Sequence, residues 1–278
     1  MRLFEILCAG AMLAWNGTAL AADATPPNIA EALASAGRPH TDILLDGQLK
    51  TAEVLAFAGV KPGQAAVQLL PETGYYARLL SLAVGSKGQL DIIVPMAAGP
   101  GMTLEQRRGA LLPKEVIQGR PLSRIEYAYS LEDQPEFPNL TTYWETADAW
   151  MSLPKQADLV FSANAYHVFK SGEVGKFDAA TMNKQIFQAT NNGGTYLVID
   201  NAADADTVKK EVTAAGFVLD GESKALAPAS FTLRFKKPMD AANTNMRPPN
   251  PIAALSGYFG NTRRGRSEEH TSELQSHH

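Results

Sequence analysis

Residues 65–84 read AAVQLLPETGYYARLLSLAV, and this stretch decides the fold. It opens with a short apolar run, Ala65–Leu70, which has the length of a buried strand. A turn over residues 71–74 follows. Apolar side chains then recur at the three- and four-residue spacing of one helix face: Tyr76, Leu79, Leu80, Ala83 and Val84. Strand, turn and helix form the first half of a βαβ unit, and open α/β sheets bind nucleotide-like ligands at such turns.

The rest of the chain repeats this alternation. Four later runs predict strands: Gln89–Val94, Arg124–Tyr129, Ala157–Ser162 and Thr195–Asp200. Helical patterns cover residues 46–58, a broken stretch over residues 103–119, and Thr146–Leu153, Asp178–Thr190 and Asp204–Ala215. Residues 131–140 are typical of a loop, and the last two runs, Phe217–Asp220 and Ser230–Phe235, should pair antiparallel. The pattern predicts a three-layer α/β sandwich whose Rossmann-like, mostly parallel sheet ends in a C-terminal antiparallel hairpin.

The N-terminal residues predict export. Residues 1–21 carry a cation near the start, an apolar run from Ile6 to Trp15, and Ala19-Leu20-Ala21 before Ala22. This is the layout of a secretory signal peptide, and the apolar run is shorter than the ~20 residues that span a bilayer. We therefore expect a periplasmic or secreted protein with no membrane segment after cleavage, followed by a Pro- and Ala-rich linker over residues 22–45.

Residues 46–237 are expected to form the α/β domain. The Pro- and Asn-rich residues 238–265 are expected to be a loosely ordered tail. Residues 266–278, RSEEHTSELQSHH, look like the translation of a sequencing-library adapter, and they have no apolar periodicity. We expect this last segment to be an artefact that contributes nothing to the fold.

The composition excludes several kinds of function. The 278-residue chain has a net charge of −4 and no basic block, so nucleic acid is not an expected partner. Its single cysteine, Cys8, lies in the expected signal, so neither disulfides nor thiol chemistry are expected after cleavage. Outside the adapter-like segment only His40 and His167 remain, and two isolated histidines do not predict a metal site.

Short motifs over residues 38–238 carry a family resemblance. They include Gly59-Val60-Lys61-Pro62-Gly63, Gly74-Tyr75-Tyr76, Tyr166-His167 after Asn164, and Leu233-Arg234-Phe235. In these pieces the chain resembles the class I SAM-dependent methyltransferases, and among them a group of predicted, exported bacterial methyltransferases. The resemblance implies the sandwich described above, S-adenosylmethionine (SAM) as cofactor, and methyl transfer as the reaction.

The resemblance also implies a cofactor site at the opening turn. It would be formed by Gln68, Pro71, Glu72, Gly74 and Tyr75. The family has an acid at the first of these positions and glycines after it, whereas this chain has Gln68, Leu70 and Glu72. Glycine allows close approach of the backbone to a ligand, and a Glu72 carboxylate would repel the carboxylate of the cofactor. Alternatively, Glu72 or Thr73 only caps the following helix. The acid that the family uses for the ribose is absent from Val94-Pro95-Met96.

Asn164, Tyr166 and His167 are the candidate catalytic residues. They follow the fourth predicted strand, at the edge where open sheets bind ligands, and in the resembled fold this loop lies beside the transferring methyl group. His167 suits a general base, because an unperturbed imidazole has a pKa of about 6.5. The alternative is that His167 and Tyr166 only pack the loop through local hydrogen bonds.

Two functions follow from these patterns. The first is an exported SAM-dependent methyltransferase-like enzyme that transfers a methyl group to an unidentified substrate. The second is a catalytically degenerate protein that binds a small-molecule ligand on the same scaffold, since one fold supports both roles.

Overall fold

The computed structural model describes residues 25–71, 73–96, 134–146, 151, 153–172 and 177–241. Its helices are α1 (Pro27–Leu33), α2 (His40–Leu45), α3 (Thr51–Ala58), α4 (Tyr75–Val84), α7 (Tyr166–Ser171), α8 (Ala179–Ala189) and α9 (Ala205–Ala214). Its strands are β1 (Ala65–Leu69), β2 (Gln89–Met96), β3 (Leu140–Thr146), β4 (Ala157–Ala163), β5 (Thr190–Asp200), β6 (Val218–Ser223) and β7 (Phe231–Lys236). These strands form one sheet in the order β3-β2-β1-β4-β5-β7-β6, in which β7 alone runs opposite to the other strands.

The opening strand and helix lie where the sequence predicts them. β1 is central and pairs in parallel with β2 and β4, so its last four residues are buried. α4 follows Gly74 and ends before Gly85, and both glycines have positive φ angles, 74° and 68°. Glycine adopts this conformation without the steric cost that a Cβ brings. α1 packs over α4, so most side chains of α4 are buried.

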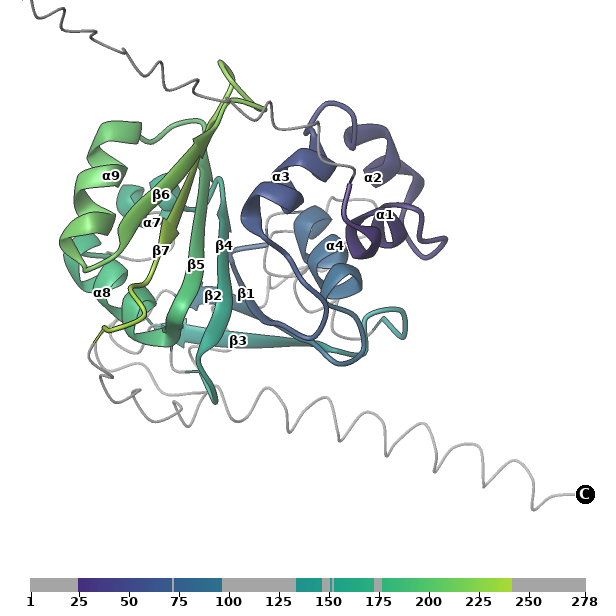
Figure 1. Ribbon diagram of the computed structural model, residues 1–278, viewed down its shortest axis with the longest axis horizontal. Helices are drawn as coiled ribbons and strands as arrows, with labels where there is room; N and C mark the ends of the chain where they lie inside the picture. The colour runs from purple at the N-terminus through teal and green to yellow at the C-terminus, as the bar shows by residue number, and fades with distance from the viewer. Residues whose placement is uncertain are drawn as a thin grey trace, which may run out of the picture.

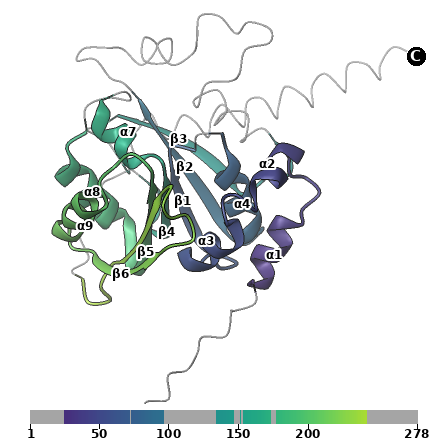
Figure 2. The same cartoon turned by 90° about the horizontal axis from the view of Figure 1, so that it is seen from above.

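Helices cover both faces of the sheet, which confirms the three-layer prediction (Figures 1 and 2). Successive residues of a strand point to opposite faces. Ala66 and Phe161 therefore pack with residues of α1, α3 and α4, whereas Val67 and Val160 pack with residues of α7, α8 and α9. Each face has its own apolar cluster. The sheet, with the edge at which its strands end, lies between the two helical layers.

The C-terminal hairpin is confirmed, and β5 begins earlier than predicted. β6 and β7 pair antiparallel, and β7 lies between β5 and β6. α8 ends at Ala189 and β5 starts at Thr190 rather than Thr195. Gly193 and Gly194 therefore lie inside the strand, where a Cβ on Gly194 would come within 2.7 Å of the Asn191 carbonyl oxygen. Glycines in a strand often mark such close approaches of the backbone.

The third strand differs from the prediction. β3 is Leu140–Thr146, LTTYWET, and it pairs in parallel with β2. The predicted strand Arg124–Tyr129 and the predicted helix over residues 103–119 lie outside the described residues. The prediction of a helix from Thr146 is wrong at its first residue, which ends β3. Thr141 and Thr142 interrupt the apolar pattern that would have indicated this strand. Thr142 is nevertheless fully buried by the packing of the sheet.

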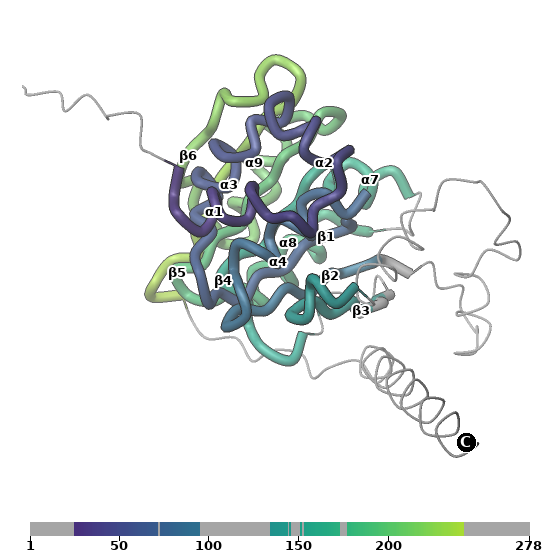
Figure 3. The backbone as a smooth tube through the Cα atoms, turned by 90° about the vertical axis from the view of Figure 1, so that its right-hand side faces the viewer, coloured from purple at the N-terminus to yellow at the C-terminus, as the bar shows by residue number. Residues whose placement is uncertain are grey.

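The expected linker of residues 22–45 is also wrong, because it contains α1 and α2. Ile29 is fully buried, and the Asn28 side-chain amide donates to the carbonyl oxygens of Val60 (3.2 Å) and Ala83 (3.1 Å). In Figure 3, where this layer faces the viewer, both helices lie in front of the sheet. Each has only six or seven residues, which is too few for the periodicity of a helix to be detected.

The described residues contain no helix with the length and apolar character that crossing a bilayer requires. The expected signal of residues 1–21 and the expected adapter-like segment 266–278 lie outside the described part of the chain.

Candidate functional site

The sheet changes its direction of growth between β1 and β4. From β1 the chain adds β2 and β3 on one side, and it then returns to add β4 and β5 on the other. Open α/β sheets bind ligands beyond the carboxyl ends of the strands at this switch point. Leu69 at the end of β1 pairs in register with Ser162 near the end of β4. The turn after β1 and the residues that follow Ala163 therefore lie at one edge.

The turn after β1 keeps a glycine-like backbone without all of the glycines. Leu70 has a φ angle of +48°, and its side chain is almost fully buried. A positive φ costs a residue with a Cβ about 1–2 kcal/mol. The Gly74 N–H donates to the Pro71 carbonyl oxygen (2.7 Å) and closes the turn before α4. Glu72 lies outside the described residues, so the choice between capping and facing the crevice stays a prediction.

Besides the hydroxyl oxygen of Ser162, two side-chain oxygens at this edge are buried without a hydrogen-bond partner. They are Oε1 of Gln68, on β1, and Oδ1 of Asn164, directly after β4. Gln68 is 1% exposed and shares its face of the sheet with Ala66, so it points towards the α4 layer. Asn164 has a φ of +50°, and its N–H donates to the Ile199 carbonyl oxygen (2.8 Å). Buried polar atoms are nearly always paired, so these acceptors are suited to a ligand that donates hydrogen bonds.

Tyr75 uses its hydroxyl group within the protein. The hydroxyl donates to Asp46 (2.6 Å) and makes a short hydrogen bond with the hydroxyl of Thr51. Burial, and then the neighbouring Asp46 carboxylate, raise the pKa of Tyr75. Arg38 holds the same carboxylate with two hydrogen bonds of 2.8 and 2.5 Å. The predicted cofactor contact of Tyr75 is therefore left to its backbone N–H at the start of α4, where helices lack internal acceptors.

An ion pair missed by the sequence analysis holds α2 against α4. Arg78 donates to both carboxylate oxygens of Asp42, at 2.7 and 2.8 Å, and the two side chains are only 2% and 7% exposed. Arg78 also donates to the carbonyl oxygen of Thr73 (3.3 Å), inside the turn after β1. The N-terminal helices therefore brace the turn from outside. The sequence analysis did not identify the role of Asp42 in this ion pair, because Asp42 falls within the expected linker of residues 22–45.

His167 lies at the start of α7 and is paired with Asp200 at the end of β5. The imidazole Nδ1 is 2.9 and 3.0 Å from the two carboxylate oxygens. Asp200 is fully buried, whereas the His167 side chain is 29% exposed. The Asp200 carboxylate also accepts hydrogen bonds from the backbone N–H groups of His167 (3.2 Å), Ala202 (2.9 Å) and Ala203 (2.8 Å).

These contacts explain the charge state of Asp200. Burial alone would raise the pKa of the carboxyl group, but the N–H groups of Ala203 and Ala202 and the His167 ring outweigh it and lower the pKa. A carboxylate that accepts several N–H bonds stays ionised even when it is buried. The sequence placed Asp200 only as the end of a strand. Its position at the carboxyl edge was the signal that could have identified it.

Tyr166 points away from this edge and into the helical layer. It is fully buried, and its hydroxyl donates to Glu211 of α9 (2.6 Å) and accepts from Asn183 of α8 (2.8 Å). Burial also raises its pKa. Of the three candidate catalytic residues, the structure therefore brings Asn164 and His167 to the edge of the sheet and gives Tyr166 contacts that join α7, α8 and α9.

The end of β2 supplies no carboxylate, as the sequence predicted. Val94 is buried, and residues 95–96 are proline and methionine. Asp91 lies mid-strand, 4% exposed, and accepts from the Gln89 side chain (3.0 Å). Burial raises its pKa to about 6. On the next strand Glu145 is fully buried and pairs in register with Pro95, so an acid lies one strand away from the position the family uses.

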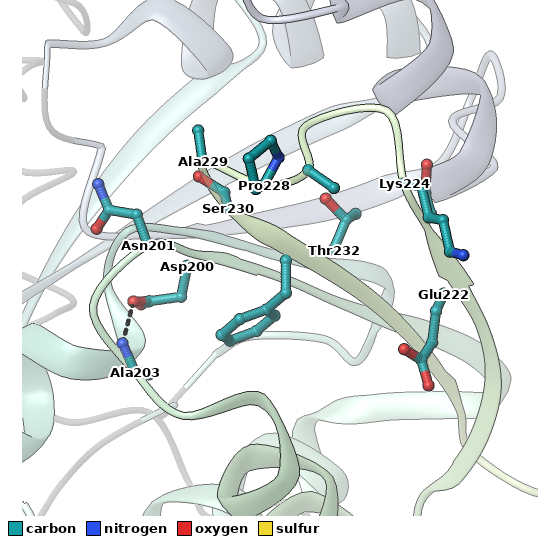
Figure 4. Close-up of a pocket in the computed structure, with 12 residues that line it drawn as sticks. Asp200, Asn201, Ala203, Glu222, Lys224, Pro228, Ala229, Ser230 and Thr232 are labelled. Carbon is teal, nitrogen blue, oxygen red and sulfur yellow. Dashed lines mark hydrogen bonds between the residues drawn. The ribbon is translucent and has the colours of Figure 1, made fainter.

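A pocket of about 370 Å³ lies at the end of β5 and the β6–β7 loop (Figure 4). Its lining includes Asp200, Asn201, Ser230 and Thr232. The hydroxyl oxygen of Thr232 is buried and has no partner. Figure 4 shows Asp200 turned towards the Ala203 N–H, so its carboxylate belongs to the wall of the pocket and is already bonded. Among the described residues no cluster of three metal-ligating side chains occurs.

Of the comparisons with known proteins, only the one with solved structures finds neighbours. No protein-family model and no curated protein matches the chain. The structure is similar to a SAM-dependent methyltransferase from Aquifex aeolicus, at 15% identity and a TM-score of 0.48, over 72% of this chain and 94% of that one. It is also similar to a TehB-like SAM-dependent methyltransferase from Corynebacterium glutamicum, at 14% identity and a TM-score of 0.45, over 69% and 87%.

A third similar structure is Aeropyrum pernix fibrillarin in complex with natively bound SAM, at 12% identity and a TM-score of 0.43, over 66% of this chain and 73% of that one. The strand order itself, a doubly wound β3-β2-β1-β4-β5 core with an antiparallel β7 inserted beside β6, defines the architecture. The chain has a class I methyltransferase-like fold.

Proposed function

We propose that this protein binds SAM at the switch point between β1 and β4 and acts as an exported methyltransferase. The single observation that carries the proposal is the pair of buried acceptors without partners, Gln68 Oε1 and Asn164 Oδ1. The amino group of SAM is an ammonium that donates hydrogen bonds. Two carbonyl-type oxygens with no protein donor suit such a group, because leaving them unpaired costs about 1–3 kcal/mol each.

The start of α4 suits the other end of the amino-acid moiety. The first N–H groups of a helix have no internal acceptors, and the helix dipole favours an anion there. Tyr75 contributes an N–H group at this point, directly after Gly74. We assign the SAM carboxylate to this N–H group and its ammonium to Gln68 and Asn164.

When bound, SAM would supply an electrophilic methyl group on a sulfonium centre. The residues of this chain would supply the rest. Gln68 and Asn164 orient the cofactor, and His167, at the same edge of the sheet, is the candidate for moving a proton. Its 29% exposure leaves the ring accessible to a substrate.

One observation favours the second function, a degenerate small-ligand-binding protein. Leu70 stands where the family has glycine, and its buried side chain limits how closely a cofactor can approach the backbone. On this view the crevice accepts another small molecule with a hydrogen-bond donor, and transfer chemistry has been lost.

Calorimetric titration of the full chain with SAM tests the first function. Wild type is expected to bind. Gln68→Leu, which keeps the size and removes the acceptor, is expected to weaken binding about tenfold or more, as a hydrogen bond to a charged group is worth about 1.5–3 kcal/mol. 5′-Methylthioadenosine, which lacks the amino-acid end, should bind both variants equally.

Thr232→Val is the matched control. It also removes a buried oxygen without a partner, but on β7, away from the switch point. Thr232→Val should leave SAM affinity unchanged, although it and Gln68→Leu relieve a similar desolvation cost, that of one buried oxygen. Absence of SAM binding by wild type would favour the degenerate function, and equal binding by Gln68→Leu would contradict the assigned ammonium contact.

Export is part of the same proposal. Cleavage after Ala21 would give a periplasmic or secreted protein, as the layout of residues 1–21 predicts. Mass spectrometry of the protein recovered from the periplasm or medium is expected to show Ala22 as the first residue. An intact N-terminus in the cytoplasmic fraction would contradict it.

A further inference from the structure

The pair formed by His167 and Asp200 fixes which nitrogen of the imidazole carries hydrogen. A carboxylate has no hydrogen to donate, so the contact at 2.9 Å requires Nδ1 to be the donor. In the neutral ring Nε2 is then the nitrogen with a free lone pair. Within the described part of the chain Nε2 has no hydrogen-bond partner, and the side chain is partly exposed.

Asp200 is itself held in place from three directions. Its Oδ1 accepts from the N–H groups of Ala202 and Ala203, and its Oδ2 accepts from the N–H of His167. The carboxylate therefore has little freedom to turn away from the ring. Because β5 and β4 are adjacent, Asp200 and His167 follow neighbouring strand ends at the same edge as Asn164.

We propose that Asp200 is a positioning residue that makes Nε2 of His167 a proton acceptor for a substrate hydroxyl or amine. The inference rests on the proposed function and names its substrate class, a nucleophile that must lose a proton. The O–H or N–H bond of the substrate breaks, the proton forms a bond to Nε2, and the electron pair stays on the substrate atom. The Asp200 carboxylate offsets the charge of the imidazolium, which later releases the proton to water.

The decisive variant is Asp200→Asn. The amide oxygen would keep the bonds from Ala202 and Ala203, which places the amide NH₂ against His167. The NH₂ group then takes the place of Oδ2, 3.0 Å from Nδ1, and it donates. The amide oxygen in the place of Oδ1 is also 2.9 Å from Nδ1, but it already accepts from Ala202 and Ala203. We therefore expect Nδ1 to become the acceptor and the hydrogen to move to Nε2. An analogous Asp-to-Asn change in a catalytic triad acts through the wrong tautomer in this way.

Nitrogen-15 NMR of the His167 ring in the full chain measures the tautomer directly. Wild type is expected to show the Nδ1–H form, and Asp200→Asn the Nε2–H form. Asp204→Asn is the matched control, because Asp204 also accepts a backbone N–H, from Thr207 (2.8 Å), but does not contact the histidine. It should leave the wild-type tautomer unchanged. A role for Asp200 that only holds the loop through Ala202 and Ala203, and does not fix the ring, would alter stability and leave the same tautomer in both proteins.

Diethyl pyrocarbonate, which modifies unprotonated imidazole nitrogens, gives a second readout. Peptide mapping is expected to show His167 modified several-fold more slowly in Asp200→Asn than in wild type, with His40 as an internal reference. An Nε2–H tautomer in wild type, or the same tautomer in both proteins, would overturn the positioning role. If wild type binds SAM but its His167 is in the Nε2–H form, this inference alone is overturned. If His167 is in the expected Nδ1–H form but wild type does not bind SAM, the proposed function is overturned and, with it, the proton transfer.

Discussion

The turn after β1 and the edge formed by β4 and β5 differ in how their buried polar atoms find hydrogen-bond partners. At Asp200 one buried carboxylate meets four N–H groups and needs no ligand to be satisfied. At the turn, by contrast, Gln68 has a buried oxygen with no partner, and Leu70 adopts a backbone conformation that suits glycine. The first arrangement is complete in the protein alone, and the second is not.

The difference indicates that the turn after β1, unlike the edge at Asp200, is not optimised for stability alone. A buried acceptor without a partner and a leucine with positive φ each cost about 1–3 kcal/mol. Such costs cluster where a protein binds something. The sequence alone suggested the opposite, because the loss of glycines made the turn look like the degraded part of the molecule.

The largest expected effect concerns what holds the turn in place. Asp42→Asn keeps the shape of the side chain but removes the negative charge that α2 places against Arg78 of α4. We expect a loss of about 3–5 kcal/mol in the free energy of unfolding, as for other buried ion pairs that lose one partner. Denaturant titration of wild type and variant measures it.

Asp206→Asn is the control for this prediction. Asp206 pairs with Lys209 but is 80% exposed, and exposed pairs contribute little, usually less than about 1 kcal/mol. A loss at Asp42 no larger than the loss at Asp206 would show that α2 does not brace the turn.

The sequence predicted the parts of the fold that depend on strong local patterns. β1, α4, α8 and the hairpin all have a clear apolar period or a capping residue, such as Asp178, whose side chain accepts from the Thr181 N–H. α1, α2 and β3 lack such a pattern. They are stabilised by tertiary contacts, among them the pairing of β3 with β2, which a single sequence does not display.

The same limit applies to the candidate site. Gln68, Asn164 and His167 could be predicted, because each lies at a strand end where the fold binds ligands. The pairing of Asp42 with Arg78 joins residues 36 positions apart, and the pairing of Asp200 with His167 joins residues 33 positions apart, so a single sequence displays neither. Tyr166 was predicted to be catalytic from its place next to His167, but the helix turns the two side chains in different directions.

Two buried aspartates should respond to pH with opposite signs. The pKa of Asp200 is lowered, so its stabilising contribution is present above the unfolded pKa of about 3.9 and is lost as the pH falls through the folded value. The pKa of Asp91 is raised to about 6, so its contribution is full below the unfolded pKa and is lost as the pH rises through about 6.

Asp91→Asn should therefore stabilise the protein at pH 8 by about 2–3 kcal/mol, which corresponds to two units of pKa, and have little effect at pH 4. The amide keeps the oxygen that accepts from Gln89. Unfolding titrations of both proteins at the two pH values measure the difference. An equal effect at pH 4 and pH 8 would mean that the charge of Asp91 is not the cause.

The smallest effect tests the turn most directly, by replacing Leu70 with alanine and with glycine. Both variants lose the same buried side-chain contacts beyond Cβ. In ordinary positions glycine is the less stable of the two by about 0.5–1 kcal/mol. At Leu70, with its φ of +48°, only glycine escapes the cost of a Cβ, about 1–2 kcal/mol. We therefore expect Leu70→Gly to be more stable than Leu70→Ala by about 1 kcal/mol.

Leu69 is the matched control, since it is fully buried in β1 and has no positive φ. There the order should reverse, with alanine more stable than glycine. Leu70→Gly should also bind SAM more tightly than wild type or Leu70→Ala. On the prediction that the Glu72 carboxylate faces the crevice, Glu72→Gly added to it should strengthen binding further, because like charges repel. If alanine is favoured at both positions by the same margin, the turn does not require a glycine-like backbone. The contrast with the edge at Asp200 would then rest on Gln68 and Asn164 alone.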